Sequence, residues 1–264
     1  MTARQFVYFH GQPGAPAELG LVWPDGGPGV ARLFVPDRAR DRPDLAIGPY
    51  LDRLAATIAQ RFSQGPIGLV GFSLGGFVAT EVALRLEQPG IARDISLDLI
   101  STAAPLGHGD FLPDMAGGAV FALARRAPRL FAALTLIQGV LARRAPGLLF
   151  GQIFAAAAGA DADLARTPGF QAALQAILAH SLADGAEGYR REILGYVAQG
   201  PERLATLRAP ITLWHGDCDN WAPPAMARAV VAQAPATRRL RAFPGLSHYS
   251  TLQAALGEIC KDLG

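Results

Sequence analysis

The strongest candidate for chemistry is a serine held between glycines, in the segment Gly71-Phe72-Ser73-Leu74-Gly75. An apolar run, Ile67–Phe72, comes before it, and a helical pattern, Phe77–Leu86, comes after it. Small residues on either side of a serine let a strand and a helix approach closely at a sharp turn, which raises the hydroxyl above a sheet. The pattern therefore predicts that Ser73 is a nucleophile, and the alternative is an ordinary glycine-rich turn whose serine only caps the helix.

A serine hydroxyl is a weak nucleophile until a base removes its proton, and the chain has five histidines that could do so. His248 stands after the apolar run Arg239–Phe243 and before a helical pattern. In a parallel sheet such a loop opens at the same edge as the turn at Ser73, so we predict that His248 is the general base. His215 is expected to pack at the end of its own strand, and His180 to lie on a helical surface.

The base in turn needs a carboxylate that orients its ring. Asp217 and Asp219 both follow one strand-like run, and the spacing from the preceding glycine favours Asp219, with Asp217 as a turn residue. Asp98 is a third candidate, but it stands in the middle of a strand, away from the edge. The order Ser73, Asp219, His248, with each residue just beyond a strand, predicts a catalytic triad.

Hydrolysis at a carbonyl also needs two donors aimed at the developing oxyanion. One should be the backbone N–H of Leu74, which directly follows the nucleophile. The other should come from the loop after the first strand, Phe6–Phe9, where the N–H of Gln12 is available. Pro13 has no N–H to donate. His10, at the start of this loop, is expected to be a structural hydrogen-bonding residue.

Short apolar runs rich in β-branched and aromatic residues alternate with helical patterns along the chain, which indicates a parallel α/β sheet with right-handed crossovers. The predicted strands are Phe6–Phe9, Arg32–Val35, Ile67–Phe72, Ile95–Ser101, Ile211–His215 and Arg239–Phe243. The predicted helices are Tyr50–Phe62, Phe77–Leu86, Met226–Ala234 and Leu252–Leu263.

One long stretch, residues 105–200, interrupts this alternation and is predicted to form several short helices. An insertion of this length between two strands is expected to be structured, so we interpret it as a cap over the carboxyl edge of the sheet. Residues 1–104 and 201–264 then form the core. The insertion is rich in Phe, Leu and Ala, which predicts an apolar pocket, with His108 and Phe111 as candidate substrate contacts.

Composition excludes several other classes of protein. The formal net charge is only +2, so nucleic acid is not an expected partner. Cys218 and Cys260 have no ligand spacing around them, so we expect free thiols, no metal and no other cofactor. Met1–His10 lacks an apolar signal region, which favours the cytoplasm. The apolar run Leu130–Ala142 is too short to span a bilayer, for which about 20 residues are needed. It predicts a buried or interfacial helix, and membrane contact is the disfavoured reading.

Together these segments resemble the α/β-hydrolase superfamily. The matching pieces are His10-Gly11-Gln12-Pro13-Gly14, Gly71–Gly76, Trp214–Asp219 and Gly245–His248. The opening loop is similar to that of epoxide hydrolases, haloalkane dehalogenases and proline iminopeptidases. The first two families use an aspartate where this chain has Ser73, so the resemblance implies the serine branch with a helical cap. It also implies an eight-stranded sheet with an antiparallel second strand, of which this chain shows six strands, and a reduced or absent first hairpin.

The predicted function is cleavage of a carboxylic ester, thioester or lactone in a hydrophobic small molecule, through an acyl-enzyme. Two alternatives stay open on the same fold. One is a cofactor-free C–C hydrolase, lyase or cyclase, because a fold does not fix the chemistry. The other is a non-catalytic binder of an apolar ligand. A dinucleotide-binding protein is the least favoured reading, because Gly71–Gly76 lacks the glycine spacing that such a site requires, and an acidic residue about 20 positions further on in a ribose-binding context. The oligomeric state is left undetermined.

Overall fold

A six-stranded parallel sheet forms the centre of the molecule, in a computed structural model that describes residues 4–24, 33–91 and 93–263. The strand order is β2-β1-β3-β4-β5-β6. This confirms the predicted fold class and the six predicted strands, although Arg32, the first residue of the second one, lies outside the described residues. The antiparallel strand that the resemblance implies is not present among those residues. The strands are β1 (Gln5–Phe9), β2 (Leu33–Phe34), β3 (Ile67–Phe72), β4 (Ile95–Ile100), β5 (Ile211–Gly216) and β6 (Thr237–Phe243).

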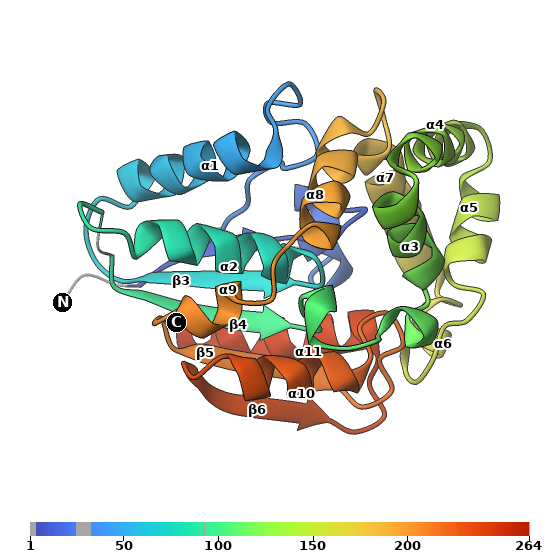
Figure 1. Cartoon of the computed structure of the whole chain (residues 1–264). Helices are drawn as coiled ribbons and strands as arrows, with labels where there is room; N and C mark the ends of the chain where they lie inside the picture. Colours follow the sequence, from blue (N-terminus) through green and yellow to red (C-terminus); the bar gives the residue numbers. More distant parts are fainter. Residues whose placement is uncertain (1–3, 25–32, 92, 264) are drawn as a thin grey trace.

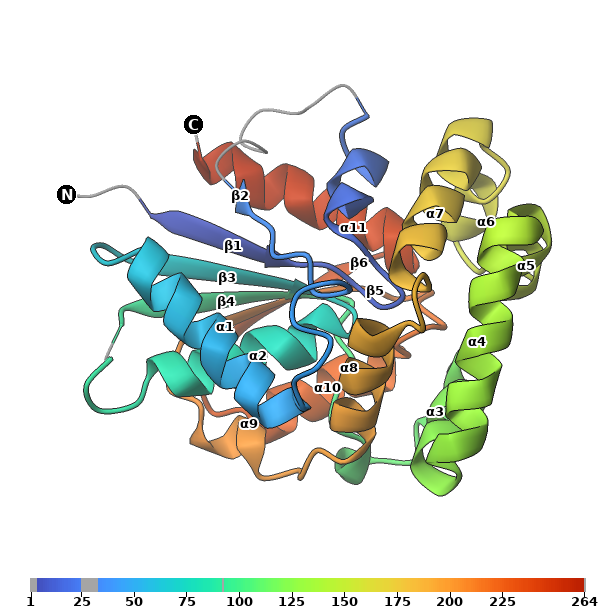
Figure 2. The same ribbon diagram turned by 90° about the horizontal axis from the view of Figure 1, so that it is seen from above.

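Alternate residues of the strands bury their side chains on opposite faces of the sheet, as the pleat of a strand requires. On one face Val7, Leu69 and Leu97 belong to a large core, and on the other Tyr8 and Val70 belong to a smaller one. Helices cover both faces, which explains why these strands are nearly continuous apolar runs. The larger core is covered by α1 (Ile47–Arg61), α2 (Gly75–Leu86) and α10 (Pro224–Gln233), and the smaller one by α11 (His248–Ile259) (Figures 1 and 2).

The four predicted helices are present, and the last begins four residues earlier than the sequence predicts, at His248 rather than at Leu252. Its first turn is held by polar side chains, which the apolar pattern does not reveal. The hydroxyl of Ser250 accepts a hydrogen bond from the N–H of Ser247 at 2.8 Å. His248 is therefore the first residue of a helix and not part of a free loop.

Helices and turns without any strand fill the chain between β4 and β5, all of which the structure describes. The helices of residues 118–197 lie beyond the carboxyl ends of the strands (Figures 1 and 2). They are α3 (Gly118–Arg126), α4 (Pro128–Arg144), α5 (Pro146–Ile153), α6 (Asp161–Leu164), α7 (Pro168–Ser181) and α8 (Glu187–Val197), after the short turns η3 (Leu106–His108) and η4 (Leu112–Asp114). The remaining elements are η1 (Pro16–Leu21), α9 (Arg203–Thr206) and η5 (Cys260–Leu263).

Candidate active site

Ser73 stands in a strained turn between β3 and α2. Its φ of 54° lies in the left-handed region, which non-glycine residues rarely adopt. The turn is tight because a Cβ on Gly75 would lie 2.1 Å from the backbone oxygen of Phe9, and one on Gly71 would lie 2.7 Å from the Cα of Gly76. Only glycine fits at both places. The close packing fixes the turn and leaves Ser73 half-buried at the carboxyl edge of the sheet.

His248 and Asp219, which β6 and β5 deliver to the same edge, form a buried pair. The Nδ1 atom of His248 lies 2.9 Å from Oδ2 of Asp219 and 3.2 Å from Oδ1. Asp219 also accepts hydrogen bonds at 2.9 Å from the N–H groups of Trp221 and Ala222. Burial alone would raise the pKa of Asp219, but His248, His215 and the Ala222 N–H together lower it. Asp219 is thus held as a carboxylate beside the imidazole.

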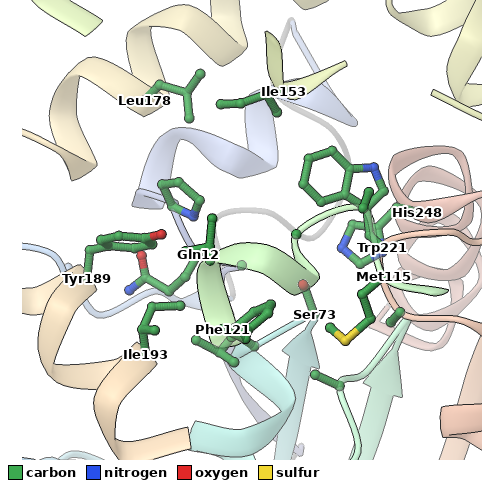
Figure 3. A pocket seen from close by; sticks show the side chains of 18 of the residues that line it. Gln12, Ser73, Met115, Phe121, Ile153, Leu178, Tyr189, Ile193, Trp221 and His248 are labelled. Carbon is green, nitrogen blue, oxygen red and sulfur yellow. The ribbon is translucent and has the colours of Figure 1, made fainter. Parts of the chain in front are cut away.

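Ser73 and His248 line one cavity, and Figure 3 shows the hydroxyl and the imidazole facing the same space. No direct hydrogen bond joins these two side chains, both of which the structure describes. Catalytic hydrogen bonds commonly tighten only when substrate binds. The rings of Phe72 and Trp221 contact the imidazole, with centroids 4.7 and 6.0 Å away, and so restrict its orientation.

Asp161, on α6, caps the helix that begins with His248. Its carboxylate accepts hydrogen bonds from the N–H of Tyr249 at 2.9 Å, the N–H of Ser250 at 2.8 Å and the Ser250 hydroxyl at 2.7 Å. The side chain is fully buried. A carboxylate at a helix N-terminus satisfies unpaired N–H groups and interacts favourably with the helix dipole. Sequence reasoning missed this residue, because its partners lie 88 and 89 positions away.

The two predicted oxyanion donors both line the cavity. Within the described part of the chain, the backbone N–H groups of Gln12 and Leu74 donate to no acceptor. The side chain of Gln12 is fixed: its Nε2 donates to Glu192 at 2.8 Å, and its Oε1 accepts from the N–H of Gly14 at 3.2 Å. The Ser181 hydroxyl donates to the same Oε1 at 3.3 Å. Residues of α7 and α8 therefore hold the loop that carries one of the donors.

A buried ion pair also holds the loop that carries Gln12. Arg38 and Glu192, both fully buried, form a salt bridge, and Arg38 also donates to the backbone oxygen of His10. Glu18 holds the other side of the loop, because it accepts from the N–H of Gly11 at 2.9 Å and from the Tyr8 hydroxyl at 2.6 Å. Burial raises the pKa of Glu18 to about 7, against the lowering effect of these hydrogen bonds.

The cavity has a volume of about 250 Å³ and is lined almost entirely by uncharged side chains. Among the described residues that line it, His248 is the one histidine, and there is no Asp, Glu, Lys or Arg. Residues between β4 and β5 supply more than half of the lining, among them the apolar Met115, Phe121, Ile153, Leu178 and Ile193 (Figure 3). The two predicted substrate contacts lie elsewhere: His108 and Phe111 are not among the lining residues, and Phe111 is buried in the core.

The other polar candidates have structural partners. The Nε2 of His215 is 2.8 Å from the backbone oxygen of Ala222, and His180 is 2.9 Å from a carboxylate oxygen of Asp37. Asp217 accepts from the N–H of Gly245 in a turn, and Asp98 accepts from the indole of Trp214. Among the described residues, no group of three or more His, Cys, Asp or Glu side chains could hold a metal ion.

Comparison with known proteins defines the family. Residues 6–260 match the model of the alpha/beta hydrolase family, so the chain belongs to this family. It is 30% identical over 164 residues to a monoacylglycerol lipase of Mycolicibacterium smegmatis. This match covers 54% of each chain. It is 40% identical over 76 residues to the polyketide synthase GfsE of Streptomyces halstedii, 28% of this chain and 2% of that protein.

The fold agrees with solved structures. A bromoperoxidase from Bacillus anthracis superposes with a TM-score of 0.66 at 16% identity, covering 99% of this chain and 92% of that one. This similarity shows the fold alone. The chain therefore spans most of this bromoperoxidase structure but about half the length, or less, of the curated relatives above.

Proposed function

We propose that this protein is a serine hydrolase that cleaves a carboxylic ester, thioester or lactone in a hydrophobic small molecule through an acyl-enzyme. The single observation that carries the proposal is the 2.9 Å contact between His248 and Asp219 at the rim of the cavity that holds Ser73. A nucleophile, a base and an orienting acid are the three groups that acyl transfer to water requires.

The proposed reaction has two halves, formation of the acyl-enzyme and its hydrolysis, and the catalytic groups act in both. With a proton on Nδ1, the His248 ring donates to Asp219, and Nε2 is left to accept the proton of Ser73. The serine oxygen attacks the carbonyl carbon, and the N–H groups of Gln12 and Leu74 stabilise the oxyanion. His248 then protonates the leaving group. Water, activated by the same ring, releases the acid and restores Ser73.

The lining of the cavity supports an uncharged, apolar substrate. Among the described residues, no Asp, Glu, Lys or Arg side chain lines the cavity, so an ionic substrate would lose its hydration without gaining a partner there. The lipase among the relatives is named for a monoacylglycerol, an ester with a long apolar part. In this proposal the helices of residues 105–200 act as the cap that closes the cavity over the sheet.

The test is the hydrolysis of p-nitrophenyl esters of increasing chain length by the wild type and by Ser73→Ala. The change should lower kcat at least about 1,000-fold, because loss of a triad member has an effect of this order. Ser101→Ala is the matched control: this serine also follows a strand and has a positive φ, but it does not line the cavity. Undiminished turnover by Ser73→Ala would remove the nucleophile. A wild type that an active-site phosphonate labels at Ser73, but that hydrolyses no ester, would favour the lyase or cyclase alternative.

A further inference from the structure

The helix α4 exposes a broad apolar face to solvent. Only Phe131, Thr135, Gly139 and Ala142 are buried, and their spacing places them on one side of the helix. On the other side large apolar side chains are exposed over more than half of their surface: Leu130, Leu136, Ile137 and Val140, by 63, 57, 58 and 51%. Figures 1 and 2 place α4 at the outer edge of the molecule.

This exposure is concentrated in one part of the chain. Among the described residues, eight large apolar side chains are exposed, and five of them lie between positions 130 and 148. Ala133 adds a fifth exposed apolar residue to α4, so the exposed positions from 130 to 140 include no polar side chain. We name these five residues of α4 the α4 face. A contiguous apolar surface of this kind marks a site of interaction.

Arginines stand at both ends of the α4 face. Arg125, Arg126 and Arg129 precede it, and Arg143 and Arg144 follow it, all of them exposed. Residues 118–153 contain no Asp or Glu, so this segment has a formal charge of +5 in a chain whose net charge is +2. In the part of the chain that the structure describes, these five side chains form no salt bridge. Their charge is therefore available to a partner.

We propose that the α4 face docks in the surface of an anionic membrane, with the helix lying parallel to it. The apolar side chains would enter between the lipids, and the guanidinium groups at both ends would contact lipid phosphates while their stems cover apolar surface. No helix among the described residues is long and apolar enough to cross a bilayer, so the binding is interfacial. From the sequence alone, membrane contact is the disfavoured reading, and the sequence does not show which side of this helix is buried.

The positive charge at both ends of the α4 face favours an anionic lipid surface over a second copy of the chain as its partner. Two copies paired through the α4 face would bring ten arginines together, and like charges in contact are repulsive. An anionic bilayer instead attracts each arginine near its surface by about 1 kcal/mol. The helix α4 and the next helix, α5, also line the cavity, through Gln138 of α4 and Leu149 and Ile153 of α5. A docked face would therefore place the cavity wall at the membrane surface. Vesicle binding needs no turnover, so the proposal does not depend on the proposed function.

The test is flotation of the wild type with vesicles of phosphatidylcholine alone and with about 30% phosphatidylglycerol added as the anionic lipid. We expect binding to the anionic vesicles only, and weaker binding as salt is raised. Arg143→Gln with Arg144→Gln should lower the partition constant about 30-fold, or about fivefold for each arginine. Ile137→Glu should abolish binding, because it places a charge at the centre of the face.

Two controls match these changes. Arg42→Gln with Arg53→Gln removes the same charge from exposed positions outside residues 105–200. Val231→Glu places the same carboxylate on another exposed apolar site. Both should bind as the wild type does. A wild type that stays off anionic vesicles overturns the proposal, and so does a control that weakens binding as much as the α4 variants do. A dimer that Ile137→Glu dissociates, without vesicle binding, would assign the face to a second copy.

Discussion

Replacing Asp161 by Asn should weaken both the fold and the catalytic geometry, because this carboxylate caps the helix that begins at His248. The carboxylate uses both oxygens, one for the N–H of Tyr249 and the other for the N–H and hydroxyl of Ser250. An asparagine has one acceptor oxygen. If that oxygen keeps the Ser250 contacts, its NH₂ group faces the Tyr249 N–H, and a buried donor loses its partner.

The magnitude follows from the two interactions that are lost. A buried donor left without an acceptor costs about 1–3 kcal/mol. The missing negative charge at the helix N-terminus costs about 1 kcal/mol more. We therefore expect Asp161→Asn to lower the free energy of unfolding by about 2–4 kcal/mol. A shift of His248 by about 1 Å would also lower kcat up to about 100-fold, with a smaller change in KM.

The assay is urea denaturation together with ester hydrolysis at a temperature where the variant is folded. Asp163→Asn is the matched control, since this residue lies on the same short helix and its side chain is 85% exposed. Its contact with Arg166 is a surface pair, worth at most about 0.5 kcal/mol. If the two variants have the same stability and the same kcat, Asp161 does not position His248.

Three further predictions concern the loop and turn around the site. Glu18→Gln should remove a pH dependence of stability, because the folded carboxyl has a pKa of about 7 against an ordinary value of 4.5. The free energy of unfolding of the wild type should fall by about 3 kcal/mol as pH rises from 4.5 to about 7. The variant should show a flatter dependence on pH in urea denaturation. Gly75→Ala should abolish folding or activity, because the added Cβ would lie 2.1 Å from the backbone oxygen of Phe9. The control is Gly257→Ala, in an open helical position, which should leave the melting temperature in circular dichroism unchanged or raise it. Glu192→Gln should cost about 3–5 kcal/mol, because it leaves the buried guanidinium of Arg38 without its counter-charge, and an unchanged melting temperature would refute this.

Local patterns were sufficient to predict the strands and the elements that carry the triad candidates. Buried parallel strands are apolar on both faces, and the glycines around Ser73 mark a close approach, so both features are visible in short segments. Contacts between distant segments were not predictable in this way. Asp161 reads as one polar residue in a helical stretch, and only the folded chain brings it to the N-terminus of α11.

The same limit applies to the pocket and to the α4 face. His108 and Phe111 begin the insertion and are natural candidates for substrate contact, yet neither lines the cavity and Phe111 is buried in the core. The run Leu130–Ala142 is apolar on nearly every side, so its sequence cannot tell which residues pack inward. Which side of such a helix is buried depends on neighbours that are distant in the sequence.

The convergence of Ser73, His248 and Asp219 is the central claim, and labelling by a fluorophosphonate, read out by peptide mass spectrometry, tests it most directly. We predict that one label attaches per chain, at Ser73, and that His248→Ala slows the labelling at least about 100-fold, because the base no longer takes the proton. A label on a different residue, or equal labelling rates in the two proteins, would contradict the account.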